Sequence, residues 1–349
     1  MSVATSTSTS TVTSTQIQLA ARPAGWPTQE DFHTATVTYG PLEPGQVRVS
    51  NLYVSVDPYM RGRMNDVRSY TAPYALGETI TGGAIGRVTA STDESVPVGS
   101  VVLHQHGWSD LVQADASTFT VVPELDGAPL SLYLGILGMT GLTGYVGLTA
   151  IADLKPGDTV FISGAAGAVG TAAGQIARLL GAGRVIGSAG SPEKVRLLTE
   201  KYGFDAALNY KDAPVREQLG ELVPGGVDVF FDNVGGDHLE AALDVMNDGG
   251  RIALCGAIAG YNATGRKPGP DNMANIITRA LTLKGFTLAG YLHLAPGFKE
   301  KMARWFAAGE IAYDETVVDG IEHTVDAFLD MMRGANTGKM VVRLTPGQE

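Results

Sequence analysis

Residues 163–170 of this chain read Ser-Gly-Ala-Ala-Gly-Ala-Val-Gly, directly after the apolar stretch Thr159–Ser163. Glycine lets a backbone turn tightly and approach a pyrophosphate, and the N-terminus of a following helix offers free N–H groups to phosphate oxygens. Ala165 stands where the G-x-G-x-x-G pattern has its first glycine, before Gly167 and Gly170. The run therefore indicates a dinucleotide site, but any glycine-rich turn between a strand and a helix can show such a pattern.

The sequence around this run alternates between short apolar strands and helical stretches, which predicts a doubly wound parallel sheet and strengthens the dinucleotide interpretation. Ser191 and Pro192 suit the N-cap and first position of one helix. The expected strands are Thr159–Ser163, Arg184–Ser188, Ala206–Asn209, Val227–Asp232 and Arg251–Cys255, and the other expected helices are Val215–Leu222, His238–Met246, Phe298–Ala308 and Thr324–Arg333.

The part of the chain before the glycine-rich run is rich in β-branched residues and turns, as in Gln46–Val56, which predicts a β domain. The fold class is therefore α/β, with a β-rich domain and a Rossmann domain. We expect a flexible Ser/Thr-rich tail over residues 1–15, a first domain over 16–130, a Rossmann domain over 131–296 and a C-terminal segment over 297–349. Its last strand, Lys339–Leu344, should return to the first domain.

Charge and composition exclude several functional classes. The net charge of −11 argues against a general nucleic-acid or anionic-membrane binder. The single cysteine, Cys255, allows neither an intrachain disulfide nor a multi-cysteine zinc site, which suits a reducing compartment such as the cytoplasm. Residues 127–152 carry no charge and a glycine at every third place from 135 to 147. A membrane helix can look like this, but we favour a buried segment at a domain junction.

The region after the second expected strand bears on the choice between NAD and NADP. An NAD site places Asp or Glu near the end of that strand to bind the ribose 2′-hydroxyl. Here residues 187–194 read Gly-Ser-Ala-Gly-Ser-Pro-Glu-Lys, with no carboxylate at the strand end. Ser188, Ser191 and Lys194 suit a 2′-phosphate. The alternative makes Ser191 a helix cap and Lys194 a solvated residue, although the first helical turn favours Glu193 over a lysine.

From about Arg22 to Leu344 the chain resembles the zinc-free double-bond reductases of the medium-chain dehydrogenase/reductase superfamily, which include prostaglandin, 2-alkenal and curcumin reductases. Each matching stretch is modest alone, but ten in the family's order are specific. They are Arg22–Pro27, Val56–Met64, Gly138–Tyr145, Ala165–Gly170, Gly190–Lys194, Asn209–Lys211, Phe231–Gly236, Cys255–Ile258, Tyr261–Asn262 and Ala335–Lys339.

The resemblance implies a GroES-like domain, a Rossmann domain, NADPH as cofactor, a small enone or enal as substrate, and a homodimer. It assigns Lys194 and Tyr210 to the 2′-phosphate and Asn233 to the ribose. Thr278 stands where animal prostaglandin reductases have a tyrosine, so no acid role is transferred to it. The expected cofactor residues are Met139, Thr143, Gly167, Ala168, Val169, Gly170, Ser188, Ser191, Lys194, Tyr210, Asn233, Cys255, Gly256, Ala257, Ile258, Tyr261, Phe286, Thr287, Leu288 and Asn336.

Reduction of an activated alkene needs hydride at the β-carbon and a hydrogen-bond donor for the enolate oxygen, and no metal. Tyr261 and Tyr59 are the candidate donors, because tyrosine stays neutral near pH 7. Either ring can instead serve packing, and the cofactor's ribose hydroxyl can share the role. His104 and His106 face one side of a strand without a third ligand, so we expect no metal there. Quinone reduction and non-enzymatic NADPH binding remain the alternative functions.

Overall fold

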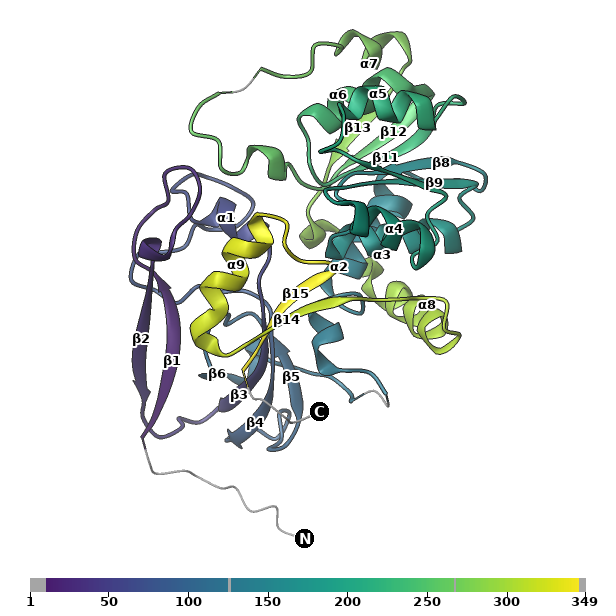
Figure 1. Cartoon of the computed structure of the whole chain (residues 1–349). Helices are drawn as coiled ribbons and strands as arrows, with labels where there is room; N and C mark the ends of the chain where they lie inside the picture. The colour runs from purple at the N-terminus through teal and green to yellow at the C-terminus, as the bar shows by residue number, and fades with distance from the viewer. Residues whose placement is uncertain (1–10, 125–126, 267, 345–349) are drawn as a thin grey trace. The chain divides into compact units, whose positions relative to one another are not determined.

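The computed structural model describes residues 11–124, 127–266 and 268–344 (Figure 1). The chain divides into two compact units. The first contains the chain up to residue 134, residues 315–336 and the stretch from 340, and the second contains residues 135–314 and 337–339. The polypeptide therefore leaves the first unit after residue 134, builds most of the second, returns at residue 315, and enters the second unit again for residues 337–339.

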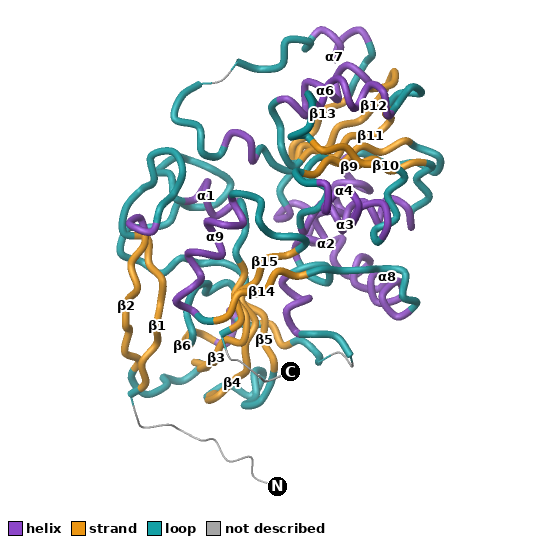
Figure 2. The backbone as a smooth tube through the Cα atoms, viewed as in Figure 1, coloured by secondary structure: helices purple, strands orange, loops and turns teal. Residues whose placement is uncertain are grey.

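The second unit is built on a parallel sheet with the strand order β10-β9-β8-β11-β12-β13, drawn in orange in Figure 2. The order reverses between β8 and β11, so this sheet has the switch point at which doubly wound folds bind ligands. The strands are β8 (Thr159–Ile162), β9 (Arg184–Ala189), β10 (Ala206–Asn209), β11 (Val227–Asp232), β12 (Met246–Leu254) and β13 (Thr282–Gly285).

Helices cover both faces of this sheet, with α3 and α4 on one side and α5, α6 and α7 on the other (Figures 1 and 2). Phe161 of β8 and Phe230 of β11 stack in the core with ring centroids 5.0 Å apart. The helices are α2 (Met139–Val146), α3 (Ala168–Leu179), α4 (Pro192–Glu200), α5 (Val215–Leu222), α6 (Asp237–Val245), α7 (Ala274–Thr278) and α8 (Ala295–Ala307).

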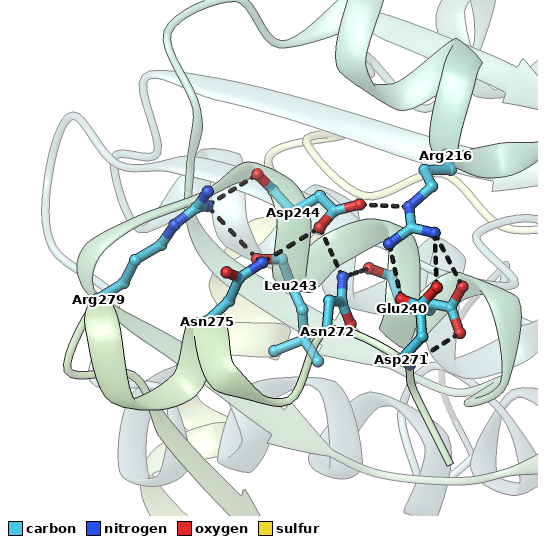
Figure 3. A network of polar contacts seen from close by, with 8 residues as sticks. All are labelled: Arg216, Glu240, Leu243, Asp244, Asp271, Asn272, Asn275 and Arg279. Atoms are coloured by element: carbon cyan, nitrogen blue, oxygen red, sulfur yellow. Dashed lines mark hydrogen bonds and ion pairs between the residues drawn. The ribbon is translucent and has the colours of Figure 1, made fainter. Parts of the chain in front are cut away.

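A polar network fastens the helices of the second face to one another (Figure 3). Arg216 of α5 contacts Asp244 and Glu240 of α6 and donates to Asp271 at 2.9 Å. Arg279 Nη1 donates to the backbone oxygen of Asp244 at 2.8 Å, near the helix end where carbonyls lack helical partners. The C-terminal end of α6 is therefore held in place, while its first turn follows β11 after a loop of residues 233–236.

The first unit contains an antiparallel sheet in the order β14-β15-β3-β4-β5-β7, with β6 also paired to β3, and a separate β1–β2 ribbon. Apolar side chains of β3, β4 and β5 form its core. Its elements are β1 (Val12–Leu19), β2 (Phe32–Tyr39), β3 (Gln46–Ser55), α1 (Tyr59–Arg63), β4 (Ala84–Ser91), β5 (Val101–His104), β6 (Leu111–Asp115), β7 (Thr120–Val121), β14 (Glu315–Asp319), α9 (Thr324–Met332) and β15 (Lys339–Arg343).

The structure corrects the expected ends of the domains. The tail expected over residues 1–15 is wrong from Val12 onward, because β1 begins there and pairs with β2; residues 1–10 lie outside the described residues. Residues 297–314 belong to the second unit, since Phe298 of α8 packs against Tyr145 of α2 at 5.8 Å. The last strand does return, because Val341 pairs with Ser55.

The uncharged stretch of residues 127–152 forms several short elements instead of one long helix. It contains a 3₁₀ segment at Leu130–Leu134, the eight-residue α2 and a π-helical turn at Gly147–Ile151. No helix in the described part of the chain is long and apolar enough to cross a membrane.

Candidate functional site

The glycine-rich turn follows β8 and is supported from β9. Gly164 has a φ of +59°, a conformation that favours glycine. Its N–H donates to Ser188 Oγ at 3.2 Å, and the N–H of Ala165 donates to the backbone oxygen of Ser188 at 2.8 Å. A Cβ at Gly170 would overlap the backbone of Gly164 and Ala165. Glycine is therefore required where helix α3 crosses the turn.

The first turn of α3 provides the donors that a pyrophosphate needs. Gly167 is its N-cap, with extended backbone and no side-chain cap. The N–H groups of Ala168, Val169 and Gly170 precede the first intrahelical bond, which runs from Thr171 N–H to the oxygen of Gly167. These donors and the positive end of a twelve-residue helix form an anion site.

A segment distant in the sequence lies beside this turn. The N–H of Gly338 donates to the oxygen of Ala166 at 2.9 Å, and Gly338 forms a parallel bridge with Gly167. Gly338 has a φ of +63°, and a Cβ there would overlap the backbone of Asp314. Residues 337–339 thus lie against the glycine-rich turn, beside the candidate phosphate site. No pattern within the glycine-rich run indicates this contact.

The ends of β8, β11 and β12 are joined through one residue, Asp232, by its buried carboxyl group and its backbone oxygen. Asp232 Oδ1 accepts from Ser163 Oγ at 2.7 Å and from the N–H groups of Val234 and Gly235 at 2.9 Å each. The backbone oxygen of Asp232 accepts from the N–H groups of Cys255 and Gly256. Burial raises the pKa of Asp232, while the bonds to Oδ1 oppose that shift. Asp232 therefore fixes the loops that leave two neighbouring strands.

Asn233 strengthens the same junction. Its side-chain Nδ2 donates to the backbone oxygen of Ser163 at 2.8 Å, and its N–H donates to Ser163 Oγ at 2.8 Å. Its backbone oxygen accepts from the N–H of Ile258 at 3.3 Å. Asn233 thus lies at the switch point between β8 and β11.

The turn that follows β12 carries the candidate acid. Tyr261 Oη accepts from the N–H of Ala257 at 3.4 Å and lies close to the α-carbon of Gly256. Burial raises the pKa of Tyr261, so the phenol keeps its proton. Because the oxygen accepts from the backbone, the O–H remains available to a substrate oxygen. Burial also raises the pKa of the neighbouring Cys255 thiol to about 12, so this residue contributes its backbone and not a thiolate.

The opposite end of the site contains the residues expected at a 2′-phosphate. Ser191 caps α4 by accepting from the N–H of Lys194 at 3.3 Å. Burial, and then the charge of Lys211, lower the pKa of Lys194; two neighbouring cations favour a bound anion. The hydroxyl of Tyr210 lies against Gly190, where any Cβ would overlap it.

Ser188, an expected cofactor residue, is fully buried. Its hydroxyl accepts from the N–H of Gly164 at 3.2 Å, so Ser188 supports the glycine-rich turn.

The remaining expected residues lie on several elements. Met139 and Thr143 occupy one face of α2, with Thr143 Oγ1 donating to the oxygen of Met139 at 2.8 Å. Phe286–Leu288 directly follow β13, and the Phe286 ring packs on Phe231 at 6.4 Å. Asn336 belongs to the first unit and immediately precedes residues 337–339 of the second.

Tyr59 opens α1 of the first unit. Burial, followed by the nearby Asp57 carboxylate, raises its pKa, so this phenol is also protonated. Thr278 ends α7 and is exposed, which gives no reason to assign it an acid role.

His104 and His106 have ordinary hydrogen-bond partners. His104 Nε2 pairs with Asn51 Oδ1 at 2.8 Å, and the N–H of His106 donates to His104 Nδ1. Across the described ranges, no group of three His, Cys, Asp or Glu residues could hold a metal ion.

Sequence reasoning missed Asp232, Ser163 and residues 337–339 as parts of the site. A polar residue at the end of each of two adjacent strands was a usable signal for Asp232 and Ser163, because carboxyl ends of parallel strands meet at one edge. The resemblance singled out Ala335–Lys339, but nothing local showed that residues 337–339 lie beside the glycine-rich turn, since that contact arises from the tertiary fold.

Comparison with known proteins bears on the family of the chain. Residues 15–122 match the family described as the N-terminal domain of oxidoreductase, and residues 168–308 match the family described as zinc-binding dehydrogenase. The chain is 38% identical to the NADPH-dependent curcumin reductase of Escherichia coli, over 93% of this chain and 95% of that protein. It is 39% identical to the NADP⁺-dependent 2-alkenal reductase of Nicotiana tabacum, over 95% of this chain and 97% of that protein.

A solved structure is similar along nearly the whole chain. The crystal structure of CurA in complex with NADPH from Vibrio vulnificus matches with a TM-score of 0.90 and 39% identity, covering 95% of this chain and all of that one.

We predict that Asp232→Ala weakens both folding and dinucleotide binding. The change leaves the Ser163 hydroxyl and the Val234 and Gly235 N–H groups without their acceptor, at a cost on the order of 1–3 kcal/mol per unsatisfied group. Asp232→Asn keeps an acceptor oxygen and should lose less. Chemical unfolding and NADPH titration of both variants measure the difference. Equal binding by the alanine variant and the wild type would contradict the assigned role.

Proposed function

The chain belongs to the zinc-independent double-bond reductases of the medium-chain dehydrogenase/reductase superfamily, and we propose that it reduces the carbon–carbon double bond of α,β-unsaturated ketones and aldehydes with NADPH. Its relatives of 38–39% identity include enzymes named for curcumin and 2-alkenal reduction. It is an NADP-dependent oxidoreductase, and its substrate is a small molecule.

The observation that supports this chemistry best is the protonated phenol of Tyr261, set on the backbone turn that follows β12. NADPH supplies the hydride to the β-carbon when it is bound. The chain orients the dinucleotide through the α3 N-terminus and the Asp232 junction. Tyr261 donates a hydrogen bond to the carbonyl oxygen, which stabilises the negative charge that develops there, and a proton from solvent at the α-carbon completes the saturated product. No step in this scheme requires a metal.

The reaction is tested by supplying enones, enals and quinones in separate assays with NADPH. We expect saturated ketones or aldehydes to form in step with NADPH oxidation. Faster turnover of quinones than of any enone would instead favour a quinone reductase. NADPH binding without turnover of any acceptor would favour a non-enzymatic role. Neither alternative is favoured by the named relatives.

We predict that Lys194→Ala weakens NADPH use and leaves NADH use nearly unchanged. A lost charge-assisted hydrogen bond is worth roughly 1.5–3 kcal/mol, or about ten- to a hundredfold in kcat/KM for NADPH. Arg196→Ala is the matched control, because it removes the same charge from the same helix at a residue whose partner is Glu193. Equal use of NADH and NADPH by the wild type would contradict this assignment.

We predict that Tyr261→Phe lowers kcat while NADPH affinity stays close to that of the wild type. A positioned acid contributes typically 10²–10⁴-fold, and a ribose hydroxyl sharing the role would reduce the loss. Tyr59→Phe tests the other candidate, with Tyr133→Phe as control because its phenol donates to a backbone oxygen. Enone turnover and separate cofactor binding should be measured for each variant and for the Tyr59/Tyr261 double variant.

The outcome identifies the donor. A larger loss in Tyr59→Phe would move the role to the first unit. Unchanged kcat in the double variant, with chemistry rate-limiting, would rule out both tyrosines and leave the ribose hydroxyl or an ordered water.

Metal independence follows from the proposed chemistry, which needs a proton donor and no Lewis acid. We expect turnover to survive prolonged chelation, with no stoichiometric zinc by elemental analysis. One tightly held zinc per chain, required for turnover, would overturn this expectation.

We also propose a homodimer that forms along β13. This strand ends the sheet order, and Thr282, Lys284 and Gly285 are exposed on it. Ile277 and Met273 expose 84% and 51% of their surface nearby in the chain. Free strand edges beside apolar side chains favour pairing with another chain. Light scattering should give a mass of twice 36.4 kDa; the mass of one chain at micromolar concentration would contradict this.

The proposed cellular location is the cytoplasm, where NADPH is available and where the single cysteine stays reduced. Cell fractionation with activity measurement tests this location. Activity confined to a membrane or secreted fraction would contradict it.

A further inference from the structure

The first turn of α6 contains a histidine that the proposed reaction does not use. His238 is 5% exposed, and its Nε2 is buried without a hydrogen-bond partner among the described residues. Buried polar atoms normally have a hydrogen-bond partner, so a buried nitrogen without one needs an explanation. Burial also lowers the pKa of His238 to about 4, so the ring is neutral near pH 7. No hydrogen bond at Nε2 holds this side chain, which is seated by ring contacts.

One of those ring contacts is with Tyr210, a residue expected at the 2′-phosphate. The imidazole lies parallel to Phe161 of β8, with centroids 6.5 Å apart and an angle of 6°. Its other aromatic neighbour is Tyr210, which meets it edge-to-face at 5.6 Å and 73°. Edge-to-face contacts fix the direction of both rings. His238 thus forms the buried side of a contact whose other member is 42% exposed.

The position of the Tyr210 hydroxyl depends on the direction of its ring. That hydroxyl lies against Gly190, between the end of β9 and the cap of α4. The backbone of Tyr210 is fixed separately, because its N–H donates to the oxygen of Ala189 at 3.1 Å. With the backbone fixed on one side, the ring direction is set by the surface beneath it. His238 provides that surface.

We propose that His238 is a positioning residue for Tyr210 and thereby sets the preference for a 2′-phosphorylated dinucleotide over its unphosphorylated form. The inference rests on the proposed function only in assigning the 2′-phosphate to Tyr210. His238 acts through the flat face and edge of its ring, and its unpaired nitrogen has no part in this role. A flat aromatic side chain should therefore replace it, and a branched aliphatic one should not.

The experiment compares His238→Leu with His238→Phe and reads kcat and KM separately for NADPH and NADH. We expect the leucine variant to raise the KM for NADPH about tenfold. Loss of a whole charge-assisted hydrogen bond would change it about ten- to a hundredfold, and a displaced Tyr210 ring weakens such a bond without removing it. Its KM for NADH and both kcat values should change little. The phenylalanine variant should keep the wild-type preference.

Phe230→Leu is the matched control, because Phe230 stacks on the same Phe161 ring but lies on β11 and has no ring contact with Tyr210 among the described aromatic pairs. It should lower the unfolding temperature and leave cofactor preference unchanged. If it shifts the preference as far as His238→Leu does, the effect comes from general loss of packing and the proposal is overturned.

Tyr210→Phe separates the inference from the assignment on which it rests. If this variant loses NADPH preference and His238→Leu then adds little to the loss, His238 acts through Tyr210. The effects of substitutions at two coupled residues are not additive. If Tyr210→Phe loses the preference but His238→Leu alone does not, only the inference fails. An unchanged preference in Tyr210→Phe overturns both. Equal weakening of NADPH and NADH in His238→Phe would mean that the nitrogen contacts adenine directly, which also overturns the positioning role.

Discussion

The hydrogen bonds accepted by Asp232 hold together the strand ends on which the cofactor site is built. Ser163 at the end of β8, the loop after β11 and the turn after β12 all bond to this one residue. A parallel sheet brings such ends to one edge, but their loops need a partner that sets their direction. Because the carboxyl is buried, its bonds are shielded from water and are costly to lose. Asp232 thereby fixes the positions of the glycine-rich turn and the Tyr261 turn relative to each other.

The fold could be predicted largely from the sequence where local patterns agree with tertiary packing. Val227–Asp232 and Val215–Leu222 have the bounds expected from their apolar patterns, and Ser191 caps α4 as its position before Pro192 predicts. The first strand was missed from Val12 because its Ser/Thr-rich sequence resembles a tail, while pairing with β2 orders it. The position of α8 was missed because the partner of Phe298 lies far away in the sequence.

The candidate site shows the same limit. The glycine-rich run and Lys194 were proposed from chemical features in short stretches, whereas Tyr210 was proposed from the family resemblance alone. For Ser188 the sequence shows that a hydroxyl is present but not that it is fully buried against the glycine-rich turn. Gly338 and His238 were missed for a related reason. Gly338 contacts Ala166 and His238 contacts Tyr210, and only the folded chain brings these residues together.

The central claim is that this chain directs hydride to the β-carbon of an activated alkene, with a neutral phenol at the carbonyl oxygen. The most direct test uses NADPH deuterated at the transferable C4 position, an enone substrate, and mass spectrometry and NMR of the product. The account predicts one deuterium at the β-carbon of a saturated ketone, because the cofactor supplies the hydride and the protein only orients it. Deuterium at the carbonyl carbon of an unsaturated alcohol, or oxidation of NADPH with no label in any product, would contradict it.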